Sequence, residues 1–255
     1  MNINKNLVSI IMASYNAEKY IEEAIDSVLS QTYSNWELFV IDDFSKDNSV
    51  NIIKKYSEKD SRIKLIVSEV NQGPGATRNL GLKLAKGRFV AFLDSDDIWS
   101  DQKLENQIHF MLKGSIPISY TSYSIIDSLS KDTGHSIIVN NKKLRYTDYL
   151  KNTIIGFSTS IIDTKYFKYN FELVPLRSRE DTFLWISLLK DKSIFALGLN
   201  EKLVKYRVHE TSITSNKIHS AYLVWRLYRD YVNLNIIQAF YYFSFYLYNT
   251  LKKRI

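Results

Sequence analysis

The chain of 255 residues contains no cysteine and only three prolines and eight glycines. Without cysteine, disulfide bonds, thiol nucleophiles and thiolate metal ligands are all excluded, so any metal ion must be bound by oxygen or imidazole. There is no internal repeat, no low-complexity tract and no stretch rich in proline and glycine that would indicate a linker. A hydrophobic fraction of 45% is sufficient for a substantial core.

The amino terminus also lacks the pattern of a signal peptide. The apolar run from Leu7 to Ala13 is short, and no small-residue cleavage site follows it, so we expect the domain to stay in the cytoplasm. A net charge of +7 suits nucleic acid, an anionic membrane or a phosphorylated substrate as a partner. Because the basic residues are spread along the chain without a nucleic-acid-binding motif, nucleic acid is not an expected partner.

The first half of the chain alternates short apolar runs with amphipathic segments. The apolar runs have the length and branching of buried strands, and the segments between them have helical spacing, the first with Asn16 as its expected N-cap. This alternation predicts right-handed βαβ units, and therefore an α/β fold with a mostly parallel central sheet flanked by helices. The predicted strands are 7–13, 36–41, 63–67 and 89–93, and the predicted helices follow Asn16 and cover 47–57 and 76–85.

A polar cluster follows each of these four predicted strands. The clusters are Ser14-Tyr15-Asn16, Asp42-Asp43, the glycine loop 71–75, and Asp94-Ser95-Asp96-Asp97. In parallel sheets, ligands bind beyond the carboxyl ends of the strands. The sequence therefore predicts one binding site along this edge of the sheet.

The acidic cluster 94–97 carries three carboxylates in four residues. Such carboxylates repel one another unless a cation or hydrogen bonds compensate. Hard oxygen ligands favour Mg²⁺ or Mn²⁺, which in turn bridge phosphate oxygens. The alternative is a solvated acidic turn that caps the next helix. An EF-hand is excluded, because the position that requires glycine is Trp99.

Two further sites on this edge point to a nucleotide. The stretch from Gly73 to Arg78 starts like a dinucleotide fingerprint, but Arg78 stands where the last glycine belongs. We interpret it as a helix start that leaves Arg78 available to a nucleotide or phosphate, with a surface cation as the alternative. Asp43 can accept the imide N–H of a uracil on which Tyr15 stacks, or Asp42 and Asp43 can simply cap the next turn.

The pattern is less regular after about Lys113. Glu180 and Asp181 precede an apolar helix, where they either complement the helix dipole or provide a general base that faces the metal site. Arg207 and His209 are two apart on a presumed strand and share one face, where they can meet a diphosphate or a metal ion. A structural role is the alternative for this histidine. The predicted elements here are strands at 118–126, 157–162 and 203–208 and a helix at 181–189.

Four stretches resemble the family-2 glycosyltransferases with the GT-A fold, in particular the small bacterial members that build surface polysaccharides such as capsule and O-antigen. They are VSIIMASYNAEKYIEEAIDSVLSQTYSNWELFVIDDFSKDNS, NQGPGATRNLGLKLAKGRFVAFLDSDD, REDTFLW and KYRVHETSI. The resemblance covers most of residues 7–110 and two later segments. It implies transfer of a sugar from a nucleotide donor, expected to be a UDP-sugar, to a lipid-linked or oligosaccharide acceptor.

The resemblance also assigns roles to individual residues. Two positions depart from the family pattern: Ala13 replaces a usual proline, and Phe44 replaces a usual glycine that often needs a positive φ, which bears on the loop beside Asp43. The expected nucleotide-binding residues are Ser14, Tyr15, Asp43, Arg78 and Asp96; the metal ligands are Asp97, Asp96 and His209; the catalytic base is Asp181; and Arg207 and Glu180 are placed on the diphosphate or acceptor side.

These residues match the chemistry of displacement at an anomeric carbon. Mn²⁺ or Mg²⁺ bridging the diphosphate would stabilise the leaving group, and Asp181 would take the proton of the acceptor hydroxyl. One base with in-line attack predicts inversion. Two rival functions are a metal-dependent phosphohydrolase, whose nucleophile would usually follow the first strand, and a non-catalytic nucleotide-sugar-binding module, which would not need Asp181.

The carboxyl-terminal segment from Tyr231 to Leu251 is uncharged and rich in tyrosine and phenylalanine, and Lys252-Lys253-Arg254 follows it. It is just long enough to span a bilayer, but scattered polar residues favour an interfacial helix on an anionic membrane. The alternative is a helix that packs on the core or on a partner subunit in a homo-oligomer. We therefore predict a GT-A domain at 1–215 (nucleotide-sugar-binding half 1–113, acceptor-side half 114–215), a helical extension at 216–255, and a peripheral location on the inner face of the cell membrane.

Overall fold

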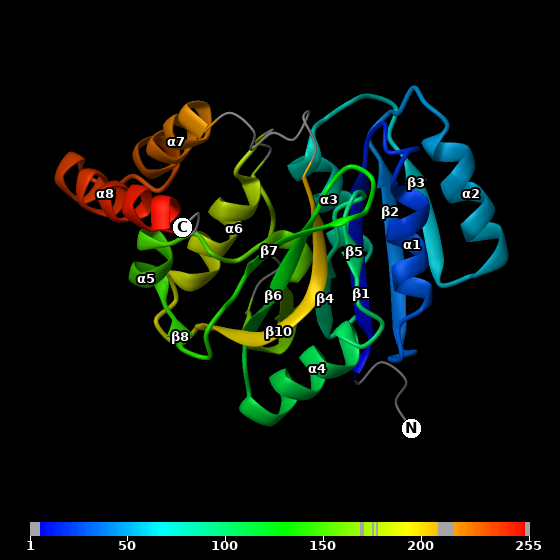
Figure 1. The fold of residues 1–255 in the computed structure, drawn as a ribbon, viewed down its shortest axis with the longest axis horizontal. Coiled ribbons are helices and arrows are strands. Elements are labelled where there is room, and N and C mark those ends of the chain that lie inside the picture. Colours follow the sequence, from blue (N-terminus) through cyan, green and yellow to red (C-terminus); the bar gives the residue numbers. More distant parts are fainter. Residues whose placement is uncertain (1–5, 169–170, 175, 177, 209–216, 253–255) are drawn as a thin grey trace.

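A computed structural model describes residues 6–168, 171–174, 176, 178–208 and 217–252. Its described strands form one ten-stranded sheet at the centre of the molecule (Figure 1). The strands are β1 (Val8–Ser14), β2 (Trp36–Asp42), β3 (Ile63–Val67), β4 (Phe89–Phe92), β5 (Ile98–Trp99), β6 (Ile118–Ile126), β7 (Asp132–Ile137), β8 (Lys143–Leu144), β9 (Ile161–Asp163) and β10 (Ala196–Arg207). Their order is β3-β2-β1-β4-β9-β6-β10-β5, with β7 beside β6 and β8 beside β10.

The first four strands confirm the predicted α/β class with a mostly parallel sheet. β1 pairs in parallel with β2 and β4, and β2 pairs in parallel with β3. β9 then runs antiparallel between β4 and β6, and β10 returns parallel to β6. Because β1, β2 and β4 are parallel neighbours, their carboxyl ends lie side by side at one edge.

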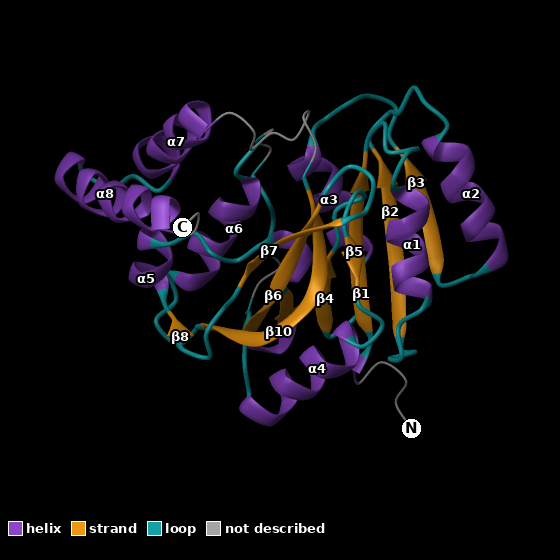
Figure 2. Ribbon diagram, viewed as in Figure 1, coloured by secondary structure: helices purple, strands orange, loops and turns teal. Residues whose placement is uncertain are grey.

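Helices cover both faces of the sheet (Figure 2). One face packs against α1, α2 and α4, and the other against α3 and α6, with α5, α7 and α8 grouped beyond α6. The helices are α1 (Ile21–Leu29), α2 (Ser49–Lys59), α3 (Pro74–Leu84), α4 (Lys103–Gly114), α5 (Tyr146–Lys151), α6 (Glu180–Leu189), α7 (Lys217–Arg226) and α8 (Ile236–Lys252), with 3-10 turns at Phe157–Thr159 and Thr164–Tyr166 and a π-helical turn at Leu227–Tyr231.

The alternation of side chains along β1 supplies both cores. Ile10 and Met12 lie in the core beneath α1, α2 and α4, whereas Ile11 lies in the core on the opposite face. Gly81 allows α3 to approach the sheet, because a Cβ at this position would lie 2.7 Å from Cδ1 of Ile41. The helix after the glycine loop is thereby held directly against β1 and β2.

Several predicted element boundaries need correction. Asn16 is not an N-cap: α1 begins at Ile21, and the Asn16 side chain instead accepts the N–H of Lys46 at 2.8 Å. Residues 157–159 form a 3-10 turn, so the strand predicted at 157–162 is reduced to β9. The strand predicted at 203–208 is the end of the much longer β10. The carboxyl-terminal helix begins only at Ile236.

Candidate active site

The predicted edge brings the ends of three strands into one site. Ser14 ends β1, and its carbonyl accepts the N–H of Asp43, which follows β2, at 2.7 Å. Asp94 lies just beyond β4, and its N–H donates to Oγ of Ser158 at 3.0 Å. Because β1 pairs in parallel with both β2 and β4, the polar clusters after these strands lie along one edge of the sheet.

Asp43 holds the glycine loop that precedes α3. Its buried carboxylate accepts the backbone N–H groups of Gln72 and Gly73, both at 2.8 Å. Asp42 is the residue that caps the next turn, since it accepts the N–H of Ser45 at 2.8 Å. Phe44, which lies between Asp43 and Ser45 in the sequence, has a φ of 68°. It therefore adopts the left-handed backbone conformation that glycine adopts most readily.

The two predicted residues beside Asp43 differ in access. The hydroxyl of Ser14 is enclosed in the protein and has no hydrogen-bond partner within the described part of the chain. Tyr15 is 51% exposed, so its side chain is accessible for stacking on a ligand.

The acidic cluster surrounds a buried carboxylate. Asp97 is 1% exposed and accepts the hydroxyl of Ser158 at 2.5 Å and the N–H of Arg207 at 2.9 Å. Burial, together with the charges of Asp96 and Asp94, raises the pKa of Asp97 well above its usual value. A nearby cation would oppose both effects, so the oxygen donors fit a hard divalent ion.

No three His, Asp or Glu side chains among the described residues are grouped as a metal site. His209, the third expected ligand, lies outside the described residues. The expected ligands that the structure does describe, Asp96 and Asp97, are consecutive residues in the turn after β4 and contribute only oxygen donors.

Arg78 connects the two sides of the site. Its guanidinium donates to Asp94 at 2.6 Å and to Glu180 at 2.6 Å, and it lies 4.6 Å from the ring centroid of Phe157. Burial disfavours the charged form, but the two carboxylates outweigh this effect and raise the pKa of Arg78. Burial also raises the pKa of Glu180, against the opposing charge of Arg78. Arg78 therefore joins α3, the end of β4 and the start of α6.

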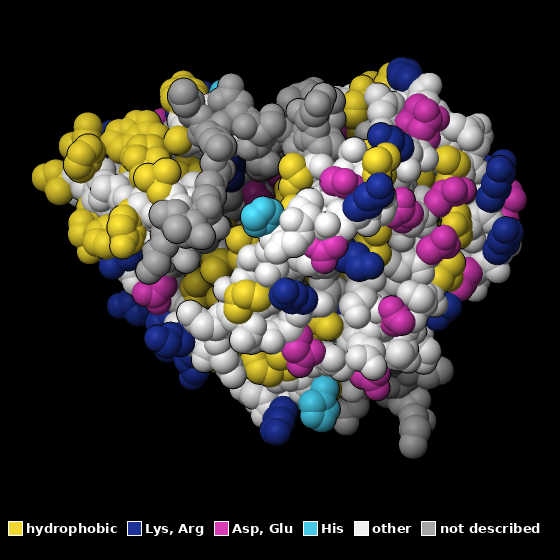
Figure 3. Space-filling model, viewed as in Figure 1, with side chains coloured by type: hydrophobic (Ala, Val, Ile, Leu, Met, Phe, Trp, Pro, Cys, Tyr) yellow, Lys and Arg dark blue, Asp and Glu magenta, His cyan; other side chains and the backbone are white. Residues whose placement is uncertain are grey.

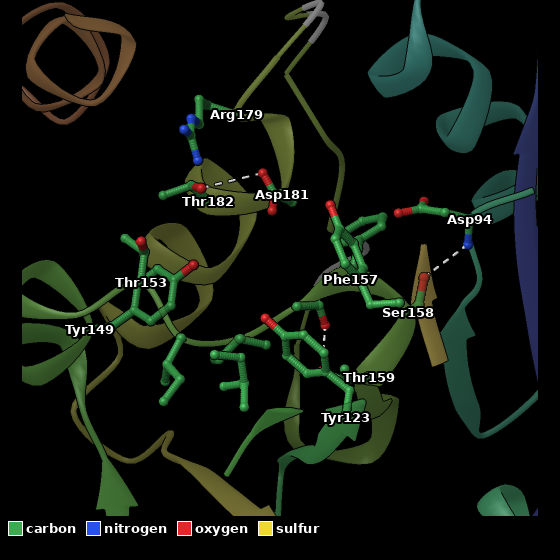
Figure 4. Close-up of a pocket in the computed structure, with 15 residues that line it drawn as sticks. Asp94, Tyr123, Tyr149, Thr153, Phe157, Ser158, Thr159, Arg179, Asp181 and Thr182 are labelled. Carbon is green, nitrogen blue, oxygen red and sulfur yellow. Dashed lines mark hydrogen bonds between the residues drawn. The ribbon is translucent and has the colours of Figure 1, made fainter. Parts of the chain in front are cut away.

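Asp94 and Asp181 line a common cavity of about 220 Å³. Figure 4 shows Asp94 on one wall and Asp181, in the first turn of α6, on another. The hydroxyl of Thr182 donates to the Asp181 carboxylate at 3.3 Å. The remaining lining residues are Tyr123, Ile137, Tyr149, Thr153, Ile154, Ile155, Gly156, Phe157, Ser158, Thr159, Arg179, Thr182 and Tyr206.

Three residues of this site were not identified from the sequence. Ser158 lies between Asp94 and Asp97 and hydrogen-bonds to both. Arg179 lines the cavity with a φ of 69°, and its buried Nε has no partner within the described chain. Burial, followed by the charge of Asp181, raises the pKa of Tyr149 well above its usual value. Only Arg179 had a signal in the sequence, because it directly precedes the acidic pair.

Arg207 lies behind the acidic turn rather than in the cavity. Its fully buried side chain donates to the carbonyl of Asp96 at 2.7 Å, to Ser130 at 2.8 Å and to Glu23 at 3.0 Å, and packs on the Tyr20 ring. Its backbone N–H donates to Asp97. In this position Arg207 fixes the turn that carries Asp96 and Asp97.

The order and direction of the strands define a fold of the GT-A class, with which the solved structures agree. Staphylococcus aureus TarS, residues 1–349 in complex with UDP, superposes with a TM-score of 0.68 at 22% identity over 94% of this chain and 70% of that chain. The Pyrobaculum calidifontis mannosyltransferase PcManGT, in complex with GDP-Man and Mn²⁺, has a TM-score of 0.67 at 16% identity over 89% of this chain and 64% of that one. These likenesses establish the GT-A fold.

The sequence comparisons establish the family. The model of glycosyl transferase family 2 matches residues 9–171. The teichuronic acid biosynthesis glycosyltransferase TuaG of Bacillus subtilis is 42% identical over 98% of both chains. The Escherichia coli UDP-Glc:alpha-D-GlcNAc-diphosphoundecaprenol beta-1,3-glucosyltransferase WfgD is 44% identical over 97% of this chain and 94% of its own. The chain belongs to glycosyl transferase family 2 and is a glycosyltransferase.

Proposed function

We propose that this enzyme transfers a sugar from a UDP-sugar to a hydroxyl of a lipid-linked saccharide, with inversion, during synthesis of a surface polysaccharide. The observation that supports the proposal is the cavity that Asp94, at the end of β4, and Asp181, at the start of α6, line together (Figure 4). The names of TuaG and WfgD support the polysaccharide, and that of WfgD supports both the UDP donor and the diphosphate-lipid acceptor.

In this proposal the nucleotide lies along the ends of β1 and β2. Tyr15 stacks on the base, and the Ser14 carbonyl, which accepts the N–H of Asp43, holds that residue beside the nucleotide. The Asp43 carboxylate already accepts two backbone N–H groups but has further lone pairs for the uracil imide. Asp43 then both shapes the glycine loop and selects the base.

Asp97, Asp96 and His209 are the proposed ligands of Mn²⁺ or Mg²⁺, which would neutralise charge developing on the diphosphate leaving group. Ser158 and the backbone of Arg207 hold the Asp97 carboxylate in place. Arg78 already binds two carboxylates, so we propose that it aligns Asp94 and Glu180 across the site and contacts the diphosphate from that position.

Asp181 is the proposed base that accepts the proton of the attacking hydroxyl. It lies in the first turn of α6 and lines the cavity, where a substrate hydroxyl can reach it. A single base opposite the donor side accounts for attack from the face remote from the leaving group. The tyrosines and the loop 153–159 form the remaining wall, where the acceptor would lie.

The test is transfer from UDP-glucose to a synthetic acceptor in which N-acetylglucosamine is linked through a diphosphate to a short lipid. We expect UDP release that depends on the acceptor, and a product with the opposite anomeric configuration to the donor by NMR. Equal UDP release with and without acceptor would instead indicate a hydrolase. UDP binding without any release, across a panel of UDP-sugars, would indicate a binding module.

Because the proposed acceptor is anchored in lipid and nucleotide sugars are cytoplasmic, we also propose that transfer takes place at the inner face of the cell membrane. None of the helices in the described ranges is long and apolar enough to cross a membrane. We propose that the enzyme binds this surface peripherally.

A further inference from the structure

Helix α8 is apolar on its outer side as well as on its inner side. Its inner side packs through Ala239 and Tyr246, both buried in the core shared with α5, α6 and α7. Figure 3 shows apolar side chains gathered over α7 and α8 at one end of the molecule. We define the α8 outer face as the exposed residues Ile236, Ile237, Phe240, Tyr241, Phe245, Leu247, Tyr248 and Leu251.

The α8 outer face differs from the outer side of α1. The outer side of α1 carries Glu22, Glu23 and Asp26, as expected for a helix that meets water. On α8, by contrast, Ile237 is 79% exposed and Phe240 is 68% exposed. A contiguous patch of this kind marks an interaction surface, whereas single exposed apolar residues are ordinary.

The charges around the α8 outer face indicate which partner it fits. The sequence from 231 to 255 contains no Asp or Glu. Lys151 of α5 places its Nζ 5.3 Å from the ring centroid of Tyr241 and 5.1 Å from that of Phe245. Lys252 ends α8, and Lys253 and Arg254 follow it in the sequence. The described surface is therefore aromatic with a lysine, Lys151, against its rings, and the sequence of the segment 231–255 adds three basic residues and no acid.

We propose that the α8 outer face binds an anionic phospholipid surface, with the helix lying parallel to the membrane. Isoleucine and phenylalanine side chains would enter the acyl boundary, and the tyrosine hydroxyls would stay at the level of the headgroups. The lysines would meet the lipid phosphates. A second copy of the chain fits less well, since its own α8 would bring further cations and no carboxylate.

The position of α8 relative to the cavity gives this surface a purpose. The Asn249 side chain donates to the carbonyl of Lys151 at 3.0 Å, which fixes α8 against α5. Tyr149 of the same short helix lines the cavity that contains Asp181. A docked α8 would therefore hold the acceptor wall near the headgroups, where a lipid-linked saccharide presents its hydroxyl. Only this last step rests on the proposed function.

The experiment is sedimentation of the purified full chain with vesicles of phosphatidylcholine alone or mixed with phosphatidylglycerol. We expect binding to the anionic vesicles that weakens with salt, and weaker binding to the neutral ones. The double variant Ile237→Ser/Phe240→Ser should lose at least about tenfold in vesicle binding. The matched control Val70→Ser/Leu129→Ser, at exposed apolar positions outside α8, should bind as the parent does.

Thermal unfolding tests whether both double variants remain folded. UDP binding reports on the donor site independently of lipid. Parent protein that stays in the supernatant with both vesicle types would overturn the proposal. So would an α8 variant that binds vesicles as the parent does. A parent dimer by light scattering that becomes monomeric in Ile237→Ser/Phe240→Ser, without vesicle binding, would assign the face to a second copy. Because no sugar transfer is measured, failure here leaves the proposed donor and acceptor unaffected.

Discussion

The two sides of the candidate site are built in different ways. The proposed donor wall lies at neighbouring strand ends: Ser14 ends β1, whereas Asp43 follows β2 and Asp94 lies just beyond β4, and of these three residues Asp94 lines the cavity. The acceptor wall combines segments that are distant in sequence, namely 153–159, the start of α6 and the end of β10. A repeated local pattern suffices for the first wall, whereas long-range contacts such as that of Arg78 with Glu180 assemble the second.

The largest effect is expected from the donor wall on removal of the metal ion. Transfer should cease in excess EDTA and return with Mn²⁺ or Mg²⁺, because the diphosphate leaving group would otherwise develop unneutralised charge. Asp97→Asn should also lose nearly all activity while it stays folded, because burial already disfavours the charged carboxylate. Radiolabelled sugar transfer and thermal unfolding are the measurements. Full activity in EDTA would contradict the prediction.

On the acceptor wall, Asp181→Asn should reduce kcat by about two to four powers of ten, the usual contribution of a general base. UDP affinity, measured by calorimetry, should change little, because the proposed base-binding residues Tyr15 and Asp43 are not among those that line the cavity with Asp181. The matched control is Asp191→Asn, at a carboxylate beyond the end of α6 that bonds only its own turn among the described contacts. Equal losses of turnover and UDP binding would place Asp181 in the nucleotide site.

Arg78→Met tests the link between the two walls. Removing the guanidinium leaves Asp94 and Glu180 without their shared partner, and breaking a buried ion pair in this way costs about 3–5 kcal/mol. The control Arg226→Met breaks an exposed pair with Asp230 and should cost less than about 1 kcal/mol. Urea unfolding measures both. If the two substitutions cost the same free energy of unfolding, Arg78 does not join the walls.

The smallest effect concerns a buried lysine in the first half of the chain. Lys103 of α4 is fully buried, and burial lowers its pKa well below the usual value. The unfolded chain therefore binds this proton more readily than the folded one, so the contribution of Lys103 to stability rises with pH until the ordinary lysine pKa is reached. Lys103→Met should remove that slope and raise Tm by about 2–4 °C, the shift that corresponds to 1 kcal/mol in a domain of this size.

Calorimetric unfolding between neutral and alkaline pH measures this slope. Lys113→Met, at an exposed position near the end of the same helix, should leave both Tm and its pH dependence unchanged. A lower Tm for Lys103→Met at every pH would show that the hydrogen bond from Lys103 to Gln107, at 2.8 Å, outweighs the cost of burial.

The sequence alone was sufficient for β3 and β6, whose predicted bounds match the structure, and for the order of strands and helices through β4. Local apolar periodicity determines those elements, because each must bury one face or both. The sequence did not reveal the 3-10 turn at Phe157–Thr159, although this turn places Ser158 between Asp94 and Asp97. A single serine carries no periodic signal, since its role depends on which strand lies beside it.

The sequence by itself therefore determined the α/β class, the order of strands through β4 and the polar residues at the carboxyl ends of those strands. Only the tertiary structure decided that Arg78 joins Asp94 to Glu180, that Arg207 lies behind the acidic turn, and that α8 presents an apolar outer face. The physical reason is the range of the interactions. Strand and helix patterns follow from neighbours a few residues apart, whereas ion pairs and helix faces depend on segments that meet only after the sheet has formed.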